Sequence, residues 1–273
     1  MSNDVVRVAV AGAGGRMGRA LVAAVMHEPA MKLAAALDVP DSPVQGRDAG
    51  EGAGLVTGVR ISADIDAALA QSDVLIDFTR PAGTLAHLAA CVRAGVGAVV
   101  GTTGLDNAQR AALAQHAQKV PVVFAANMSV GVNVLLSLVE QAARALGPAF
   151  DIEVVEMHHR HKVDAPSGTA LRLGEAAAAG AGVSLAESAV YAREGHTGER
   201  KPGTIGFATL RGGDVVGEHV VVFAGEGERV ELAHRATSRQ LFANGAMRAV
   251  QFVAARRAAG AAGLFDMPDV LGL

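Results

Sequence analysis

Short apolar runs alternate with segments of helical periodicity through the first half of the chain. Val5 to Ala11 is a continuous apolar run with a single arginine, which is typical of a parallel strand buried on both faces. The segment from Arg16 to His27 has the spacing of an amphipathic helix. Further strands and helices are expected in turn at Lys32 to Leu37, Val74 to Phe78, Pro81 to Gly95, Val96 to Val100, Asn107 to Lys119 and Pro121 to Ala125. This repetition predicts an α/β fold with a doubly wound parallel sheet.

The pattern changes after about Asn127, where the regular alternation ends. Helices are expected at Val132 to Leu146, Gly168 to Ala179 and Thr237 to Arg257, and strands at Phe150 to Met157, Ile205 to Leu210, Val215 to Phe223 and Arg229 to His234. The turn Arg211-Gly212-Gly213-Asp214 suits a hairpin between two of these strands. We therefore expect a second, α+β domain with a largely antiparallel sheet at residues 129–240, and a first domain of residues 1–128 with 241–273.

Composition narrows the class of protein. The chain has 273 residues and is 51% hydrophobic but only 3% aromatic, so alanine, valine and leucine must fill most of the core. No segment approaches the ~20 unbroken apolar residues that span a bilayer, and no secretory signal is recognised. Cys91 is the single cysteine and lies in an apolar run, which favours a packed core residue and a reducing, cytoplasmic environment. The net charge of −3 gives no support for nucleic-acid binding.

The most distinctive segment is the basic run His158-His159-Arg160-His161-Lys162, which follows a predicted strand. Imidazole groups exchange protons near neutral pH, and the neighbouring guanidinium and ammonium groups add fixed positive charge. Shortly afterwards Ser167 can cap a helix that begins with Gly168 and Thr169, and a helix N-terminus favours anions. This pattern is typical of a site that holds and protonates a small, multiply charged anion. A solvated basic loop is the alternative interpretation.

A glycine-rich loop joins the first predicted strand to the first helix. It comprises Gly12-Ala13-Gly14-Gly15-Arg16-Met17-Gly18 and departs from the usual dinucleotide fingerprint, because Met17 stands where the third glycine is expected. Asp38 ends the second predicted strand, where a carboxylate can accept both hydroxyls of an adenosine ribose. The loop, its position and Asp38 together predict a Rossmann-type dinucleotide-binding domain.

Two later strand ends fall where a dinucleotide would extend across such a sheet. Gly101, Thr102 and Thr103 offer backbone and hydroxyl groups to the nicotinamide ribose, and the segment Ala125-Ala126-Asn127-Met128 could orient the carboxamide. Val39 follows Asp38 in place of an arginine that would bind a 2′-phosphate. We therefore expect NADH to be used well and NADPH, if used, to depend on Arg16.

The chain resembles the 4-hydroxy-tetrahydrodipicolinate reductase family, long called dihydrodipicolinate reductases. The resemblance extends over nearly the whole chain and is carried by the glycine loop, Gly101-Thr102-Thr103-Gly104, the stretch 126–133, the stretch from Glu156 to Thr169, and the segments 205–209 and 216–219. It implies an NADH- or NADPH-dependent oxidoreductase of the diaminopimelate route to lysine, with a Rossmann-type domain and a second domain that builds a homotetramer. The alternative of an unrelated dehydrogenase for aspartate-derived precursors would not need the basic run.

By the same resemblance, His158 falls on the family's catalytic acid/base position and Lys162 on its proton donor. Substrate contacts fall on His159, Gly168 and Thr169, and cofactor contacts fall on Gly12, Ala13, Gly14, Gly15, Arg16, Met17, Asp38, Gly101, Thr102, Thr103, Ala125, Ala126, Asn127 and Met128. The implied substrate is a small cyclic dicarboxylate, and the implied reaction adds a hydride and a proton to it.

Two other classes of protein remain as alternatives from the residues alone. A non-enzymatic NAD-sensing protein would keep the glycine loop but leave the basic run without a task. A metal-dependent hydrolase fits poorly, because three histidines in four positions cannot all face one ion from a regular strand. No metal is therefore expected.

Overall fold

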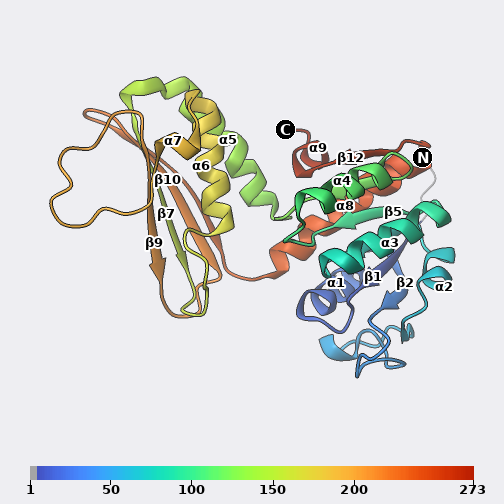
Figure 1. The fold of residues 1–273 in the computed structure, drawn as a ribbon. Helices are drawn as coiled ribbons and strands as arrows, with labels where there is room; N and C mark the ends of the chain where they lie inside the picture. Colours follow the sequence, from blue (N-terminus) through green and yellow to red (C-terminus); the bar gives the residue numbers. More distant parts are fainter. Residues whose placement is uncertain (1–4) are drawn as a thin grey trace. The chain divides into compact units, whose positions relative to one another are not determined.

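The chain divides into two units, each of which has a β-sheet of its own (Figure 1). The structure is a computed structural model and describes residues 5–273. The first unit contains the residues up to Ser129 together with Gln240–Gly272, and the second contains Val130–Arg239. Within the described residues, none of the helices combines the length and the apolar character needed to cross a membrane.

The first unit is built around a seven-stranded parallel sheet. Its strands are β1 (Val6–Ala11), β2 (Met31–Leu37), β3 (Ile61–Ser62), β4 (Val74–Asp77), β5 (Gly97–Val100), β6 (Pro121–Phe124) and β12 (Gly263–Phe265). Their order is β12-β6-β5-β4-β1-β2-β3, and every pairing is parallel. The chain therefore turns to opposite sides of β1 in its two halves, which confirms the predicted doubly wound sheet.

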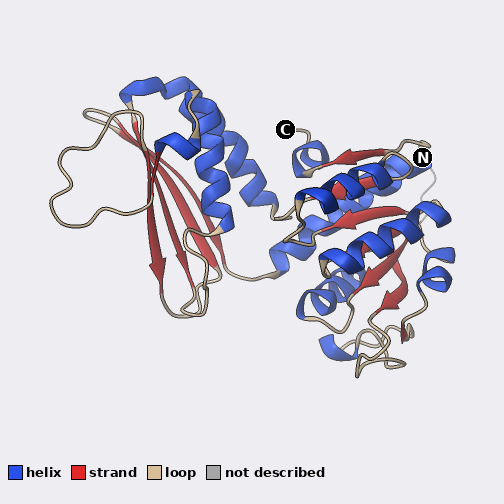
Figure 2. Cartoon of the chain, viewed as in Figure 1, coloured by secondary structure: helices blue, strands red, loops and turns tan. Residues whose placement is uncertain are grey.

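Helices cover both faces of this sheet (Figure 2). They are α1 (Arg16–His27), α2 (Ile65–Ala70), α3 (Pro81–Ala94), α4 (Asn107–Ala117), α8 (Gln240–Ala258) and α9 (Met267–Leu271), with a 3-10 turn, η1 (Glu51–Ala53). Pro81 occupies the first turn of α3, and Gly95 ends that helix with a φ of 64°. A proline is preorganised for a first helical turn, and a glycine adopts the left-handed conformation of a helix end at low cost.

Small aliphatic side chains fill the core of the first unit, as the composition predicts. Val10, Leu75 and Val99 in the central strands are completely buried. Cys91 in α3 belongs to the same hydrophobic cluster as Leu75 and is also completely buried. Burial raises the pKa of its thiol to about 12, so Cys91 is a packing residue.

The second unit contains a five-stranded mixed sheet. Its strands are β7 (Asp151–His158), β8 (Ala189–Val190), β9 (Ile205–Arg211), β10 (Gly217–Ala224) and β11 (Arg229–Ala236), in the order β11-β10-β7-β9-β8. β10 runs antiparallel to both β7 and β11, whereas β9 runs parallel to both β7 and β8.

The helices of the second unit lie on one face of its sheet (Figure 2). The two long ones, α5 (Val130–Leu146) and α6 (Gly168–Ala181), contact each other; η2 (Gly147–Ala149) and α7 (Leu185–Ser188) are short. Along β7, alternate residues are buried, which directs Ile152 and Val154 toward the helices. The core of this unit also contains Phe207 and Phe223 from the flanking strands.

The predicted hairpin between the segments around Arg211 and Asp214 is wrong. β9 and β10 are separated by β7, which pairs with both of them. The connecting segment closes over the end of β7 instead: the Gly212 N–H donates to the His158 carbonyl at 2.9 Å, and the Arg160 N–H donates to the Gly213 carbonyl at 3.2 Å. The turn signal is local, whereas the pairing depends on the buried face of β7, which lies about fifty residues earlier in the sequence.

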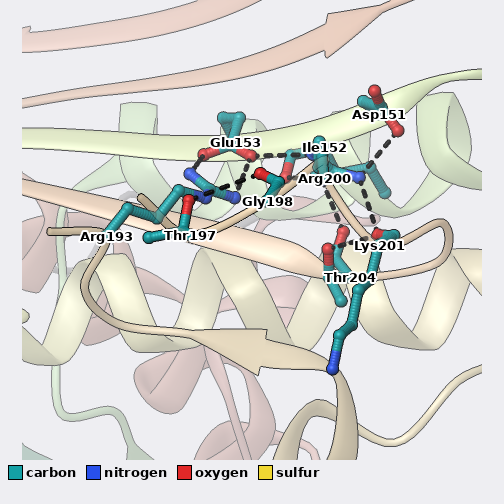
Figure 3. Close-up of polar contacts among 9 residues, drawn as sticks. All are labelled: Asp151, Ile152, Glu153, Arg193, Thr197, Gly198, Arg200, Lys201 and Thr204. Atoms are coloured by element: carbon teal, nitrogen blue, oxygen red, sulfur yellow. Dashed lines mark hydrogen bonds and ion pairs between the residues drawn. The ribbon is translucent and has the colours of Figure 1, made fainter. Parts of the chain in front are cut away.

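The long segment of residues 191–204 is attached to the start of β7 by two arginines (Figure 3). Arg193 donates two hydrogen bonds of 2.8 Å to the Glu153 carboxylate. Arg200 donates to Glu153 at 3.1 Å and to Asp151 at 2.6 Å. Gly206 in β9 leaves room for this cluster, because a Cβ there would lie 2.0 Å from the Glu153 carboxylate. The segment is therefore held by charge-assisted hydrogen bonds rather than by a core of its own.

Candidate functional site

The glycine loop is shaped so that its backbone can approach a ligand at the start of α1. Gly12 has a φ of 68°, a conformation that side chains other than glycine rarely adopt, and Gly15 is the residue that precedes the helix. Among the described residues, no side chain caps this helix and its first turn carries no acidic group. The N–H groups at its start therefore remain available to an anion, as a bound pyrophosphate requires.

Gly18 performs the packing task that the usual fingerprint gives to its third glycine. A Cβ on Gly18 would lie 2.0 Å from the Gly12 carbonyl oxygen and 2.7 Å from the Cα of Ala13. Met17 is partly exposed and makes no such demand on its position. The departure noted in the sequence is thus a one-residue shift of the glycine at which helix α1 touches the loop that follows β1.

Asp38 lies beside this loop at the end of β2. Its carboxylate accepts hydrogen bonds of 2.8 Å from the N–H groups of Gly14 and Val39. A Cβ on Gly14 would lie 2.6 Å from that carboxylate, so the contact requires glycine. Val39 is 64% exposed, so the position directly after the carboxylate offers an apolar side chain and no guanidinium. Arg16, the predicted cation of this region, is exposed.

A small pocket of about 190 Å³ borders Gly14 on the side of Arg19 and Arg47. Both cations already have partners: Arg19 donates to the Gly14 carbonyl at 3.1 Å, and Arg47 forms an ion pair with Glu51. Neither arginine was predicted as a site residue from the sequence.

The predicted segment 101–103 lies at the end of β5. A Cβ on Gly101 would lie 2.2 Å from the Phe78 ring, so glycine is needed there. Thr102 is 1% exposed, and its hydroxyl shares a 2.7 Å hydrogen bond with that of Thr84. Its side chain is therefore occupied within the protein. Thr103 is exposed.

The predicted segment 125–128 lies at the end of β6. Ala126 is exposed, Ala125 and Met128 are buried, and the Asn127 side-chain oxygen accepts the Ser129 N–H at 2.9 Å. All the predicted cofactor residues thus follow the carboxyl ends of β1, β2, β5 and β6 in one parallel sheet, which is the edge where such sheets bind ligands.

Sequence reasoning missed the pair formed at this edge by buried Asp77 and half-buried His87. Asp77 is 1% exposed, and its carboxylate accepts hydrogen bonds from Nδ1 of His87 at 2.7 Å and from the N–H and hydroxyl of Thr79 at 2.8 and 2.6 Å. Burial raises the pKa of Asp77, but the hydrogen bond and charge of His87 together with Thr79 outweigh it, so the pKa is lowered overall. The pair fixes the loop after β4 beside Gly12, whose Cβ would lie 3.0 Å from Thr79.

The basic run leaves the end of β7 in the second unit. His158 is 8% exposed, His159 and Lys162 are half-buried, and Arg160 and His161 are exposed. A turn closes the run, because the Lys162 N–H donates to the His159 carbonyl at 3.1 Å. Burial and the charge of Arg239 lower the pKa of His159. Three of the predicted residues, His158, His159 and Lys162, thus occupy one end of the sheet.

Helix α6 begins immediately beyond this run. Ser167 caps it, since its hydroxyl accepts the Ala170 N–H at 3.1 Å. Gly168 is exposed, and among the described residues no atom outside its neighbours lies within 4 Å of the position of its missing Cβ. The first turn of α6 carries no acidic residue in this part of the chain. The start of α6 at Gly168 therefore faces open space in a setting that suits a carboxylate.

A buried carboxylate connects the basic run to this helix. Glu156 is 1% exposed and accepts hydrogen bonds from Nδ1 of His158 at 2.6 Å, from the Ser167 N–H at 3.0 Å and from both terminal nitrogens of Arg211 at 2.8 and 3.0 Å. Beyond His158, the ring of His219 lies edge-on at a centroid distance of 5.1 Å. Glu156, Arg211 and His219 were not predicted as site residues. The buried, alternating positions of β7 were the signal for Glu156, but its partner arrives from a strand 55 residues later.

Neither unit offers a metal site among the described residues, where no cluster of three or more histidine, cysteine, aspartate or glutamate side chains is found. Each unit presents the start of a helix that suits an anion. The first unit adds the carboxylate of Asp38, placed where it could bind a ribose, and the second adds imidazole and ammonium groups.

Comparison with known proteins matches the chain to one family in two consecutive segments. The model of the N-terminal part of dihydrodipicolinate reductase matches residues 6–128, and that of the C-terminal part matches residues 131–271. A 4-hydroxy-tetrahydrodipicolinate reductase of Cupriavidus necator is 59% identical over 97% of this chain and 99% of the relative, and one of Laribacter hongkongensis is 58% identical over 98% of each.

A solved structure agrees with this comparison. A dipicolinate-bound dihydrodipicolinate reductase from Paenisporosarcina sp. TG-14 is 26% identical, covers 96% of this chain and 97% of its own, and superposes with a TM-score of 0.74. The fold class expected from the sequence, an α/β parallel-sheet domain with a second α+β domain, is confirmed by this likeness, but the second sheet is mixed rather than largely antiparallel.

Proposed function

The chain belongs to the 4-hydroxy-tetrahydrodipicolinate (dihydrodipicolinate) reductase family, and we propose that its first unit holds the reductant while its second unit holds and protonates the substrate. The enzyme is an oxidoreductase of lysine and diaminopimelate biosynthesis that reduces 4-hydroxy-tetrahydrodipicolinate. The full-length match sets aside an unrelated dehydrogenase and a non-enzymatic NAD-sensing protein, which the residues alone had left open. The remaining question is which residues perform the reaction.

The first unit fits a dinucleotide. The pyrophosphate would be held by the N–H groups between Gly12 and Met17, since positions 14 and 18 have no room for a Cβ and the start of α1 is uncapped among the described residues. Asp38 would accept the adenosine ribose hydroxyls. The nicotinamide end would be held by backbone groups at 101–103 and 125–128. NADH or NADPH supplies the hydride when bound there.

The preference between the two reductants follows from the neighbours of Asp38. A 2′-phosphate would approach a carboxylate and, with Val39, find no adjacent arginine. Arg16 is the predicted cation left to compensate, because Arg19 and Arg47 already have partners. We therefore propose that NADH is used well and that NADPH, where used, depends on Arg16.

The second unit fits a dicarboxylate. One carboxylate would bind the backbone N–H groups at Gly168 and Thr169, and His159 would contact the substrate from the basic run. The dipicolinate in the Paenisporosarcina protein supports a substrate of this shape. Because Glu156 hydrogen-bonds to both Ser167 and His158, it fixes the start of α6 and the His158 imidazole relative to each other.

The proton would come from Lys162 or His158. After the ring hydroxyl has left as water, hydride adds to the carbon that bore it and pushes electrons toward the nitrogen of the resulting conjugated imine. An adjacent cation stabilises that developing charge, and an acid supplies the proton that completes the reduction. Lys162 carries the fixed charge, and a proton leaving its ammonium or the His158 imidazolium would be replaced from solvent. Such a group typically contributes ~10²–10⁴-fold to the rate.

This proposal depends on one observation about the segment between the end of β7 and the start of α6. It carries two proton donors, His158 and Lys162, and leads into a helix whose first turn has no acidic residue among those described. The test is to add NADH and 4-hydroxy-tetrahydrodipicolinate to the purified chain and to follow the loss of reduced-nicotinamide absorbance. We expect turnover in the unaltered chain and its loss in both His158→Ala and Lys162→Met. Near-normal turnover in both variants would contradict the assignment of these residues.

We also propose that the second unit assembles the enzyme into a homotetramer. The sheet face opposite α5 and α6 presents Val155, Met157, Val220 and Leu210, which are partly or largely exposed in one chain. A cytoplasmic location fits a biosynthetic enzyme of this family. Light scattering of the purified chain tests the tetramer, and a monomeric mass at micromolar concentration would refute it.

A further inference from the structure

We propose that Glu156 and Arg211 are positioning residues that hold His158 through its Nδ1–H and so assign proton exchange with the substrate to Nε2. This inference rests on the proposed role of His158 in proton transfer. Neither Glu156 nor Arg211 needs to touch the substrate for it to hold. Both would act through the orientation and protonation pattern of one imidazole ring.

The Glu156 carboxylate is held in place from three directions. Its Oε2 lies 2.6 Å from Nδ1 of His158 and 2.8 Å from Nη1 of Arg211. Its Oε1 lies 3.0 Å from Nη2 of Arg211 and 3.0 Å from the N–H of Ser167. These donors belong to the end of β7, the end of β9 and the start of α6, so the carboxylate cannot rotate without breaking contacts in all three elements.

The charge of Glu156 determines which atom carries the proton. A guanidinium bound to both oxygens, with a backbone N–H besides, favours the ionised carboxylate, and although burial raises the pKa of Glu156, these contacts lower it overall. An ionised carboxylate only accepts hydrogen bonds. Nδ1 of His158 must therefore be the donor whether the ring is neutral or charged. The proton that the ring gains and loses is consequently the one on Nε2.

The surroundings of Nε2 are consistent with that task. Among the described residues no hydrogen bond to Nε2 is found, and the His158 side chain keeps 10% of its surface exposed. The nearest constraint is Gly217 in β10, where a Cβ would lie 2.9 Å from Nε2. A side chain at this position would press on the exchanging nitrogen, and glycine avoids that contact.

His219 is the other imidazole beside His158. Burial lowers its pKa to about 4, with a smaller contribution in the same direction from His158. It is therefore neutral near pH 7 and does not repel a charged His158 ring. Its Nε2 lies 3.3 Å from the Ser167 hydroxyl, which ties it to the start of α6 rather than to the exchanging nitrogen.

Arg211 extends the same support to the segment that carries Lys162. Its Nη2 donates to the Asp164 carbonyl at 2.6 Å, and its Nη1 donates to the Leu210 carbonyl at 2.7 Å. One guanidinium thus anchors the Glu156 carboxylate and the backbone that follows Lys162. Replacing it should disturb His158 by leaving Glu156 free to turn.

A purely structural ion pair would have the same distances, so the experiment must separate stability from proton transfer. The variants are Glu156→Gln, Arg211→Lys and Gly217→Ala. The control is Asp151→Asn, which removes a carboxylate from an arginine pair elsewhere on β7. Each is assayed for kcat, for KM of the dicarboxylate, for NADH affinity and for thermal unfolding. ¹⁵N spectra of the imidazoles, with His158 assigned by its own replacement, report the tautomer.

We expect Glu156→Gln to lower kcat by roughly 10²-fold, within the range that an acid contributes, while NADH affinity stays unchanged. The ¹⁵N signature of His158 should change from a single Nδ1–H tautomer to a mixture. In a His158→Ala background, the further loss on adding Glu156→Gln should be less than about 3-fold, because residues that act as a unit are not additive. Gly217→Ala, which leaves the ion pair intact, should also lower kcat.

Two results would overturn the proposal. One is a Glu156→Gln enzyme that melts at a lower temperature but keeps its kcat and its His158 tautomer. The other is full additivity of Glu156→Gln and His158→Ala, which would show that Glu156 does not act through the ring. If His158→Ala alone leaves kcat unchanged, the proposed role of His158 fails instead, and this outcome is distinguishable because it needs no change at Glu156. Should Glu156→Gln fail to fold, Arg211→Lys decides the matter through the same ¹⁵N signature and kcat.

Discussion

The ammonium of Lys162 lies 2.8 Å from the carboxylate of Asp164, and the residue between them, Val163, is 97% exposed. The contact holds the lysine side chain across a tight turn at the end of β7. It also lowers the pKa of Asp164, chiefly through the hydrogen bond from Lys162. An incoming dicarboxylate would compete with Asp164 for the same ammonium, and this relationship motivates the first two predictions.

Removing the ammonium should abolish most of the catalysis. In Lys162→Met the side chain keeps nearly its length but loses its charge and its proton, so we expect kcat to fall by ~10²–10⁴-fold. NADH affinity should stay near that of the unaltered enzyme, because the proposed dinucleotide contacts lie in the other unit. Stopped-flow reduction and NADH titration check both quantities, and a variant with equal losses in both would point to misfolding.

Removing the competing carboxylate should have a smaller and opposite effect on substrate binding. Asp164 is largely exposed, and exposed ion pairs contribute ~0.2–1 kcal/mol, so Asp164→Asn should lower the KM for the dicarboxylate by about 1.4- to 5-fold. Asp151→Asn, which breaks the pair with Arg200, is the matched control and should leave KM unchanged. A higher KM in Asp164→Asn would mean that Asp164 orients Lys162 rather than competing for it.

The choice of reductant should respond to the residue after Asp38. Val39→Arg places a guanidinium beside the carboxylate, and we expect kcat/KM for NADPH relative to NADH to rise roughly 10-fold, which corresponds to one hydrogen bond to a charged group. Val56 is 89% exposed in the same unit, so Val56→Arg controls for the added charge. A strong NADPH preference already present in the unaltered enzyme would contradict the interpretation of Val39.

Gly18 should tolerate substitution by alanine far less well than exposed glycines in the same unit. Gly18→Ala forces a methyl group to 2.0 Å from the Gly12 carbonyl, so we expect a loss of ~1–3 kcal/mol in the free energy of unfolding and weaker NADH binding. Gly52→Ala is the control, because its Cβ would meet only the flexible side chain of Arg19. Equal urea midpoints for the two variants would show that α1 can shift away from β1 at little cost.

His219 should make stability depend on pH in the weakly acidic range. Burial lowers its pKa to about 4, whereas in the unfolded chain it is near its ordinary ~6.5. Between these values the unfolded chain binds a proton that the folded chain does not, so stability falls as the pH falls from about 6.5 to about 4. From pH 7 to pH 5 this amounts to about 2 kcal/mol.

The measurement is urea unfolding at both pH values for the unaltered chain and for His219→Gln. The variant should lose most of this difference, while the lowered pKa values of His159 and His234 act in the same direction in both proteins. An unchanged pH dependence in His219→Gln would assign the effect to those other imidazoles.

Local patterns in the sequence were sufficient for most of the first unit. Helix Arg16–His27 has the predicted bounds, and the glycine loop lies where expected, because both depend on nearest neighbours in the chain. The short strand Gly263–Phe265 was missed, since three residues carry too little periodicity to be recognised. Its pairing with β6 depends on the completed sheet.

The interior of the second unit depends on contacts that no local pattern encodes. Glu156 meets Arg211 from a strand 55 residues away, and Ser167 meets His219 across 52 residues. The hairpin prediction failed for the same reason, because β7 inserts between two strands that are consecutive in sequence. The basic run was recognisable by its composition. Glu156, which accepts a hydrogen bond from His158 of this run, lies in a buried strand with no distinctive local pattern.

The chain's single thiol, in the core of the first unit, is chemically silent. Cys91 is completely buried, and its raised pKa leaves almost no thiolate at neutral pH. Alkylating dyes should therefore not react with it. An added cysteine at a solvent-facing position would then be the sole point of attachment for a fluorophore or spin label. Cys91 therefore need not be replaced before the protein is labelled at a single added cysteine for single-molecule or magnetic-resonance measurements.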